Sequence, residues 1–133
     1  MPDRTPPRPT DAELAILRVL WARGPSTVRQ VQETLNHNRP TGYTTALKLL
    51  QIMTDKGLVQ RDESTRTHVY QARLSEDQTQ GQLVRDLLDR AFGGAYQKLV
   101  MQALSSKKAS PEEFDQIRHL LDQLEGGRGH GDH

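Results

Sequence analysis

The sequence predicts a mostly α-helical fold with one small β-hairpin. Apolar residues recur at helical spacing in six stretches, each bounded by a capping residue, a glycine or a proline. Between the third and fourth stretches, residues 58–71 form two short strand-like runs separated by a polar turn, which is a hairpin pattern. A chain of 133 residues is long enough for one domain with an appendage.

The composition excludes several classes of protein. The chain has no cysteine, which excludes disulfides, thiolate metal sites and a cysteine nucleophile. Its apolar runs fall short of the roughly 18 residues of a membrane-spanning helix. The amino terminus, MPDRTPPRPT, is polar and rich in proline, unlike a signal peptide. We therefore expect a soluble, cytoplasmic protein without membrane insertion.

Charge is distributed unevenly along the chain. Residues 1–73 carry 11 Lys and Arg against 7 Asp and Glu, a net charge of +4. Residues 74–133 carry 7 against 10, a net charge of −3. This asymmetry favours a front half that meets a polyanion.

Both ends of the chain are expected to lie outside the folded part. Residues 1–9 contain four prolines and should form a flexible arm, whose Arg4 and Arg8 can reach phosphates. Residues 126–133 are rich in glycine and should form a disordered tail.

The first two helices follow from capping residues and apolar spacing. Thr10 is a good N-cap, Glu13 completes a capping box, and Gly24-Pro25 ends the first helix. Its expected core residues are Leu14, Leu17, Val19, Leu20 and Trp21. Ser26 is the expected N-cap of the second helix. The apolar face of that helix consists of Val28, Val31 and Leu35.

The third helix, residues 41–56, has two unlike sides. Pro40 keeps the residue before it extended, so the chain restarts there and Thr41 can cap the helix. One side consists of Ala46, Leu49, Leu50 and Met53 and can be buried; the other consists of Thr44, Thr45, Lys48 and Gln51. Such polar groups can hydrogen-bond base edges in the major groove, which admits an α-helix. The alternative is the solvated face of an ordinary amphipathic helix.

The hairpin completes a recognisable order of elements. Two helices joined by a tight connection, followed by a hairpin with a polar, Arg-bearing tip, form a winged helix-turn-helix arrangement. This order favours a winged-helix DNA-binding domain over residues 10–73. A winged-helix module that joins proteins without reading DNA is the competing interpretation. A small-molecule-binding regulator is a weaker one, because little chain remains for a ligand domain.

Residues 74–125 predict three short amphipathic helices. Ser75 with Gln78 caps the first, Gly93-Gly94 ends it, and Ser110-Pro111 opens the third. Short helices enclose little core, so we expect a helical dimerisation region that packs against a second copy. The alternative is that these helices fold back on the winged helix. The expected dimer interface consists of Leu83, Leu87, Leu88, Leu99, Val100, Phe114, Ile117, Leu121 and Leu124.

The sequence shows no pattern of catalysis or metal binding. No pair of its five histidines shares helical i, i+4 spacing with a carboxylate partner. It also contains no glycine-rich phosphate loop, nucleophile elbow or HExxH motif. We therefore expect no metal, no cofactor and no enzymatic activity.

Three groups of residues resemble a known family. They are Thr10-Asp11-Ala12-Glu13-Leu14 with Val19-Leu20-Trp21; Tyr43-Thr44-Thr45 with Leu49-Leu50 and Lys56-Gly57-Leu58-Val59; and Thr65-Arg66-Thr67-His68-Val69-Tyr70. In this order, over residues 10–125, the chain resembles the penicillinase-repressor (BlaI/MecI) family of winged-helix transcriptional repressors. The resemblance implies a homodimer on a two-fold-symmetric operator of double-stranded DNA and repression of neighbouring genes.

The DNA-binding residues are expected on the third helix and beside it. They are Arg39, Thr41, Tyr43, Thr44, Thr45, Lys48, Gln51 and Arg66. We expect Thr44, Thr45 and Lys48 to contact base edges and nearby phosphates, with the two arginines on flanking phosphates. Thr41 and the start of the helix would meet a phosphate through backbone N–H groups. Tyr43 lies at the margin and can instead pack along an apolar edge.

The chain departs from the family pattern at two places. It has Thr65-Arg66 in the hairpin where the family usually has Gly-Arg, so the turn geometry should differ. Antibiotic-responsive members answer to a membrane metallopeptidase sensor pathway and are cleaved at an Asn-Phe pair. The matching place here reads Gln102-Ala103. The resemblance thus implies such a pathway as a partner, with an altered cleavage place.

Overall fold

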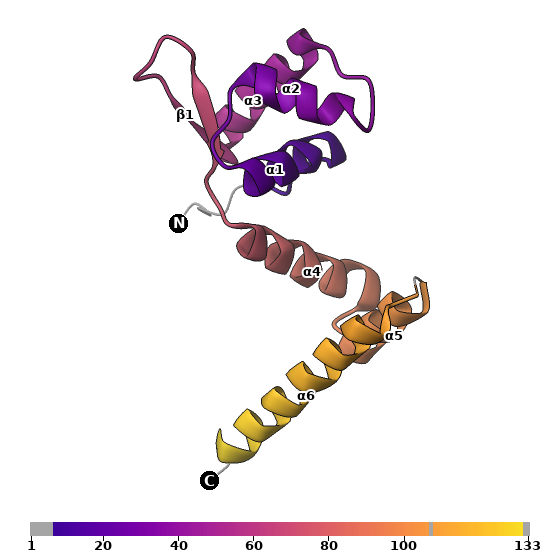
Figure 1. Cartoon of the computed structure of the whole chain (residues 1–133). Helices are drawn as coiled ribbons and strands as arrows, with labels where there is room; N and C mark the ends of the chain where they lie inside the picture. Colours follow the sequence, from indigo (N-terminus) through magenta and orange to yellow (C-terminus); the bar gives the residue numbers. More distant parts are fainter. Residues whose placement is uncertain (1–6, 107, 132–133) are drawn as a thin grey trace. The chain divides into compact units, whose positions relative to one another are not determined.

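The computed structural model describes residues 7–106 and 108–131, with side chains described up to residue 126. The elements are α1 (Asp11–Arg23), α2 (Val28–Asn36), α3 (Tyr43–Lys56), β1 (Val59–Asp62), β2 (Val69–Ala72), α4 (Glu76–Phe92), α5 (Tyr96–Ser106) and α6 (Pro111–Gly131) (Figure 1). The two strands pair antiparallel, with Val59 opposite Ala72 and Asp62 opposite Val69. This confirms the predicted fold class. Most of the predicted arm, including Arg4, lies outside the described residues.

The chain divides into two compact units between Arg85 and Asp86, within α4. This is later than the predicted boundary after residue 73. The start of α4 belongs to the first unit, because Thr79 is buried and the Trp21 indole N–H donates to the Leu74 carbonyl at 3.0 Å. The hydrophobic periodicity that marks α4 does not show which part of the helix packs on which unit.

The helices α1 to α3 and the hairpin enclose the core of the first unit. Its buried apolar residues are Ile16, Leu17, Val19, Leu20, Val28, Val31, Ala46, Leu50, Met53, Leu58, Val59 and Tyr70. Ile16 was not predicted, whereas Leu14 and Trp21 were predicted but are only half-buried. The reason is that the buried stripe of α1 runs through Glu13, Ile16, Leu17 and Leu20 at helical spacing, and its first position is a carboxylate.

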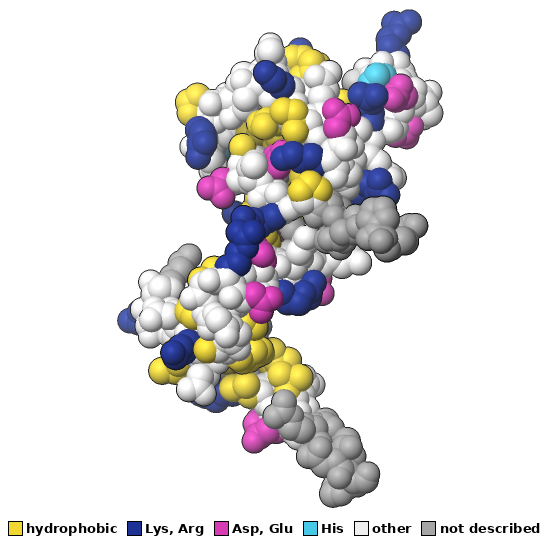
Figure 2. Space-filling model, turned by 180° about the vertical axis from the view of Figure 1, so that it is seen from behind, with side chains coloured by type: hydrophobic (Ala, Val, Ile, Leu, Met, Phe, Trp, Pro, Cys, Tyr) yellow, Lys and Arg dark blue, Asp and Glu magenta, His cyan; other side chains and the backbone are white. Residues whose placement is uncertain are grey.

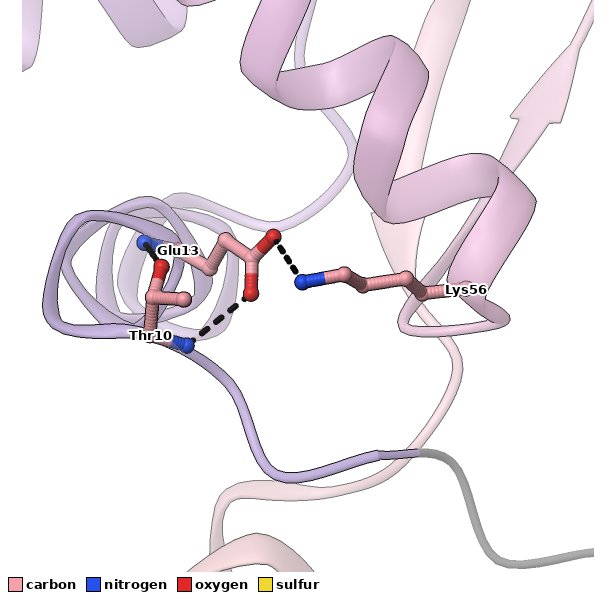
Figure 3. A network of polar contacts seen from close by, with 3 residues as sticks. All are labelled: Thr10, Glu13 and Lys56. Atoms are coloured by element: carbon pink, nitrogen blue, oxygen red, sulfur yellow. Dashed lines mark hydrogen bonds and ion pairs between the residues drawn. The ribbon is translucent and has the colours of Figure 1, made fainter.

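Glu13 is 2% exposed and links the start of α1 to the last turn of α3. Its Oε1 accepts from the Thr10 backbone N–H at 2.9 Å and the Thr10 hydroxyl accepts from the Glu13 N–H, which confirms the predicted capping box. Its Oε2 lies 2.8 Å from Lys56 Nζ in the last turn of α3 (Figure 3). Burial raises the pKa of Glu13, but the bonds from Lys56 and Thr10 outweigh burial and leave the pKa below its ordinary value.

The second helix is capped one residue later than predicted. Thr27, not Ser26, is the N-cap of α2, and it exchanges hydrogen bonds with Gln30 in a capping box. The box requires a Glu or Gln three residues after the cap, and only Thr27 has one. Ser26 instead pairs its backbone with Tyr70 through two hydrogen bonds of 2.9 and 2.8 Å. This bridge ties the loop before α2 to the wing, the hairpin β1–β2.

The third helix also begins later than predicted. Gly42, not Thr41, is the N-cap of α3 and makes no side-chain capping bond. Thr41 is held in the connector instead: its N–H donates to Asn36 Oδ1 at 2.9 Å and its carbonyl accepts from Gln32 Nε2 at 2.9 Å. At the other end, the predicted cap Gly57 is confirmed, with a left-handed φ of 83° that favours glycine.

The second unit contains the end of α4, α5 and α6. Gly93 and Gly94 have φ values of 54° and 81°, which explains why glycines separate α4 from α5. Ser110 exchanges hydrogen bonds with Glu113 and caps α6 as predicted. The backbone of α6 is helical through Gly131, where a disordered tail was predicted from residue 126. Glycine lowers helix propensity but permits helical dihedrals, so a glycine-rich composition does not fix the helix end.

Candidate nucleic-acid interface

The side of α3 opposite the core is a polar ridge. Ala46, Leu50 and Met53 have no exposed surface, which fixes the orientation of the helix. Thr44, Lys48 and Gln51 lie on the opposite side and are all exposed. We call these three residues the α3 ridge. Their hydroxyl, ammonium and amide groups project away from the fold, as the sequence predicts.

The exposed side of α3 on which the ridge lies is not uniformly basic. Asp55 is exposed and lies on the same side as Lys48, two turns further along α3. A carboxylate at that end opposes a polyanion, whereas the amino-terminal half of α3 carries Lys48 and neutral polar groups. On this side of the helix, the amino-terminal half of α3 is therefore the better surface for binding an anion.

One flank of the ridge borders a groove of about 550 Å³ beneath the wing, which we call the wing groove. Its lining comes from α2, α3 and the wing: Thr27, Val28, Arg29, Tyr43, Leu47, Arg66, Thr67, His68 and Tyr70. Two predicted residues, Tyr43 and Arg66, meet here. Arg29 was missed, and its guanidinium carbon lies 5.8 Å from the centre of the Tyr43 ring. Only its place on the polar side of α2, beside Val28 and Val31, could have indicated it.

The other flank borders a smaller cavity of about 300 Å³. It is lined by Asp11, Ala12, Ala15, Leu35, Asn38, Arg39, Pro40, Thr41, Gly42, Thr45 and Leu49. Three predicted residues, Arg39, Thr41 and Thr45, meet here, on the side of α3 away from the wing groove. The expected phosphate contact of Thr41 through its backbone N–H stays a prediction; in this structure that N–H donates to Asn36 Oδ1. The predicted residues therefore form a ridge with two separate flanks.

Local hydrogen bonds shape the tip of the wing. The Asp62 carboxylate accepts from the Ser64 backbone N–H at 2.9 Å, and the Thr65 hydroxyl donates to the Thr67 carbonyl at 2.7 Å. Hydrogen bonds from the Ser64 hydroxyl and N–H hold the pKa of Asp62 below its ordinary value. Among the described residues only glycines have positive φ, so Thr65 turns the chain without a left-handed conformation. Arg66 stands exposed beside this turn.

Comparison with known proteins shows which family this chain belongs to. A family model described as penicillinase repressor matches residues 9–123. The chain belongs to the penicillinase repressor family. The transcriptional regulator BlaI of Mycobacterium tuberculosis is 34% identical over 121 residues, which cover 90% of this chain and 86% of that protein. The penicillinase repressor of Bacillus licheniformis is 22% identical over 117 residues, which cover 88% and 91%.

A solved structure extends the comparison to the fold. RosR of H. salinarum matches with a TM-score of 0.50 and 15% identity, over 91% of this chain and 97% of that one. At this identity the likeness concerns the fold alone. The family resemblance predicted from the sequence is therefore confirmed by the family model and by the identity to BlaI.

In this penicillinase repressor family member, the predicted dimer residues are not buried within the chain. Leu87, Val100, Phe114, Leu121 and Leu124 are exposed, and Leu83, Leu88, Leu99 and Ile117 are half-buried. Tyr96, Met101 and Leu120 are also exposed and were not predicted as interface residues. Figure 2 shows hydrophobic side chains gathered over the C-terminal helices. No described side chain from residue 86 to residue 126 is buried.

Three further predictions concern a protease of a sensor pathway, a metal site and the membrane. Gln102 and Ala103 lie within α5 and are exposed, so a protease of a sensor pathway would have to act on a helical segment. Within the described residues, no three His, Asp or Glu side chains gather as a metal site. In the same part of the chain, no helix combines the length and apolar character needed to span a bilayer.

Proposed function

We propose that this protein is a transcriptional repressor that binds double-stranded operator DNA with the α3 ridge in a major groove. The exposed ridge of Thr44, Lys48 and Gln51, opposite a fully buried face of the same helix, carries the proposal. Relatives that cover most of the chain are a transcriptional regulator and a penicillinase repressor, which supports the same role. We therefore expect the protein to act in the cytoplasm, beside chromosomal DNA.

In DNA recognition, the ridge would contact base edges and its flanks would contact phosphates. Lys48 suits guanine O6 and N7, while the Thr44 hydroxyl and methyl suit a base edge or a thymine methyl. Gln51 and Thr45 extend the same contact on either side. Arg39 and Arg66 lie on opposite flanks and would contact phosphates, which fix the register without reading sequence.

We further propose that two copies join through the C-terminal helices. Eight large apolar side chains of α4, α5 and α6 in the second unit are at least a third exposed, and a second copy would cover them. Burying a leucine side chain contributes about 1.5–3 kcal/mol, so an interface of this composition can hold a stable dimer. A two-fold dimer would present two α3 ridges to half-sites about one helical turn, or a multiple of one, apart.

The test is a selection followed by a salt titration. The full-length protein is used to select duplexes from a randomised pool, and affinity for the selected duplex is measured at several salt concentrations. We expect enrichment of a two-fold-symmetric site and a slope of log K against log salt near −0.9 per neutralised phosphate. A pool that shows no enrichment, with no measurable duplex binding at low salt, would contradict the proposal and favour a protein-binding module.

A further inference from the structure

The groove beneath the wing differs from the other flank of α3 in its charge. Its lining contains Arg29, Arg66 and His68, and no carboxylate among the described lining residues. The smaller cavity on the opposite flank contains Arg39 together with Asp11, so its charges oppose each other. A groove with two arginines and no acidic side chain favours an anion over a neutral or cationic ligand.

The two arginines of the wing groove come from different elements. Arg29 lies in the first turn of α2, and Arg66 lies in the wing after a turn fixed by local hydrogen bonds. Because Tyr43, the first residue of α3, also lines this groove, an anion bound there would lie beside the start of α3. The backbone of a duplex that receives α3 supplies a phosphate beside the helix.

Tyr43 gives Arg29 a defined place in the groove. The guanidinium lies over the face of the Tyr43 ring, 5.8 Å from its centre, and both side chains are exposed. A free arginine loses rotamer freedom when it binds, and a cation–π contact with the ring reduces this loss because the guanidinium is already placed. Tyr43 would therefore act as a positioning residue for Arg29, in place of the marginal base contact or packing role expected from the sequence.

We propose that Arg29, held by Tyr43, and Arg66 of the wing together grip one backbone phosphate of the operator in the wing groove. This clamp rests on the proposed DNA-binding function and adds α2 to the contact surface. Bidentate arginine contacts to phosphate are charge-assisted and geometrically specific. The clamp holds α3 in the major groove of the DNA and contacts no base.

The experiment measures duplex affinity of full-length variants against salt. The probes are a duplex selected by the wild-type protein and a random-sequence duplex of equal length. Arg29→Ala should weaken binding to both probes alike, by about 10-fold for each contacting copy, as expected for a lost charge-assisted contact. Because Arg66 stays on the same phosphate, the salt slope should fall by less than about 0.9 per copy, or less than about 1.8 for a dimer. Arg18→Ala, which removes an exposed arginine of α1 outside the groove, is the matched control and should change affinity less than twofold.

Four further variants test the positioning role of Tyr43. Tyr43→Phe keeps the ring and should bind as wild type, whereas Tyr43→Leu should weaken binding and lower the slope. Adding Tyr43→Leu to Arg29→Ala should cost less than a further twofold, because the two residues act together. Arg29→Lys should keep the salt slope but bind more weakly, since an ammonium group cannot contact a phosphate in the bidentate manner of a guanidinium.

Four outcomes would overturn the clamp, in whole or in part. Unchanged affinity and slope in Arg29→Ala, with the wild-type protein binding normally, would remove Arg29 from the interface and leave the proposed function standing. A loss confined to the selected duplex would make Arg29 a base reader. Fully additive losses for the Arg29 and Tyr43 variants would remove the positioning role. Absence of duplex binding by the wild-type protein would overturn both proposals together.

Discussion

The two units of this chain treat their apolar residues in opposite ways. The first unit buries twelve apolar side chains in one core, and its exposed face on α3 is polar. In the second unit no described side chain is buried, and leucines of α6 such as Leu121 and Leu124 are 56% and 57% exposed. The first unit therefore has its own core, whereas the second presents apolar surface that needs a partner. In our proposal the partner of the first is DNA and the partner of the second is another copy.

The sharpest way to break this comparison is to place a charge on the apolar side of α6. In a two-fold dimer Leu121→Asp places two carboxylates in an apolar interface, so we expect the dimer dissociation constant to rise about 1000-fold, or about 4 kcal/mol. Sedimentation equilibrium measures this constant. His119→Asp lies on the opposite side of α6 and should leave the dimer unchanged. Equal association of the two variants would mean that α6 does not face the second copy.

The core of the first unit can be tested through its buried carboxylate. Glu13→Ala removes a capping bond and leaves Lys56 without its partner, so we expect the free energy of unfolding to fall by about 2 kcal/mol. Urea unfolding measures the loss. Glu33→Ala, at an exposed carboxylate of α2, should change it by less than about 0.5 kcal/mol. The dimer constant should not change in either variant if the two units are stabilised separately.

The pH dependence of this stabilisation has a defined sign. The folded-state pKa of Glu13 is lowered, so its contribution is fully present above the unfolded-state pKa of about 4.3 and is lost as the pH falls through the folded-state pKa. Glu13→Gln should therefore unfold with a weaker acid dependence than the wild-type protein below about pH 5. Parallel pH profiles for the two proteins would show that Glu13 does not titrate with folding.

Glu13 and its partner Lys56 also show how far the sequence predicts the fold. Thr10, Glu13 and Gly57 mark helix ends through local chemistry, so the order of helices, hairpin and helices is predictable. The ion pair between Glu13 and Lys56 joins residues 43 positions apart, and no local pattern contains it. The N-cap of α2 is Thr27 and not Ser26 for a local reason, the Gln three residues after Thr27. The backbone pairing of Ser26 with Tyr70, in contrast, joins distant residues and has no local pattern.

The candidate site divides in the same way. Thr44, Lys48 and Gln51 could be predicted because helical spacing alone places them opposite a buried face. Arg29 could not, because its relation to Tyr43 and to the wing depends on how α2, α3 and the hairpin pack. The capping role expected of Thr41 falls to Gly42, because hydrogen bonds to Asn36 and Gln32 hold Thr41 in the connector between α2 and α3. Packing between elements, not local pattern, decides these positions.

Lys48 tests whether the ridge of the first unit reads sequence. We expect Lys48→Ala to weaken binding to the selected duplex by about 1.5 kcal/mol, or more than 10-fold, and binding to a random duplex by much less. Fluorescence anisotropy with both duplexes measures the difference. Arg18→Ala, at an exposed arginine of α1 outside both flanks, is a control that should affect both duplexes little. Equal losses on both duplexes for Lys48→Ala would reduce Lys48 to a phosphate contact.

The smallest expected effect concerns Asp55, which lies on α3 beyond the carboxyl-terminal end of the ridge. Asp55→Asn removes a carboxylate that faces the same side as Lys48, so duplex affinity should rise about twofold to threefold at low salt and less at high salt. Glu33→Gln removes an exposed carboxylate from α2 and should raise affinity less. The same anisotropy titrations measure both. An unchanged or lower affinity for Asp55→Asn would place the carboxyl-terminal half of α3 away from DNA.

The mass of the complex between the full-length protein and its selected duplex tests the central claim most directly, because it joins the two units in one observation. Native mass spectrometry or sedimentation velocity gives the number of chains per duplex. We predict two chains on one duplex whose half-sites are about one helical turn, or a multiple of one, apart. A complex with one chain per duplex, or a Leu121→Asp variant that binds the full site as tightly as wild type, would contradict the account.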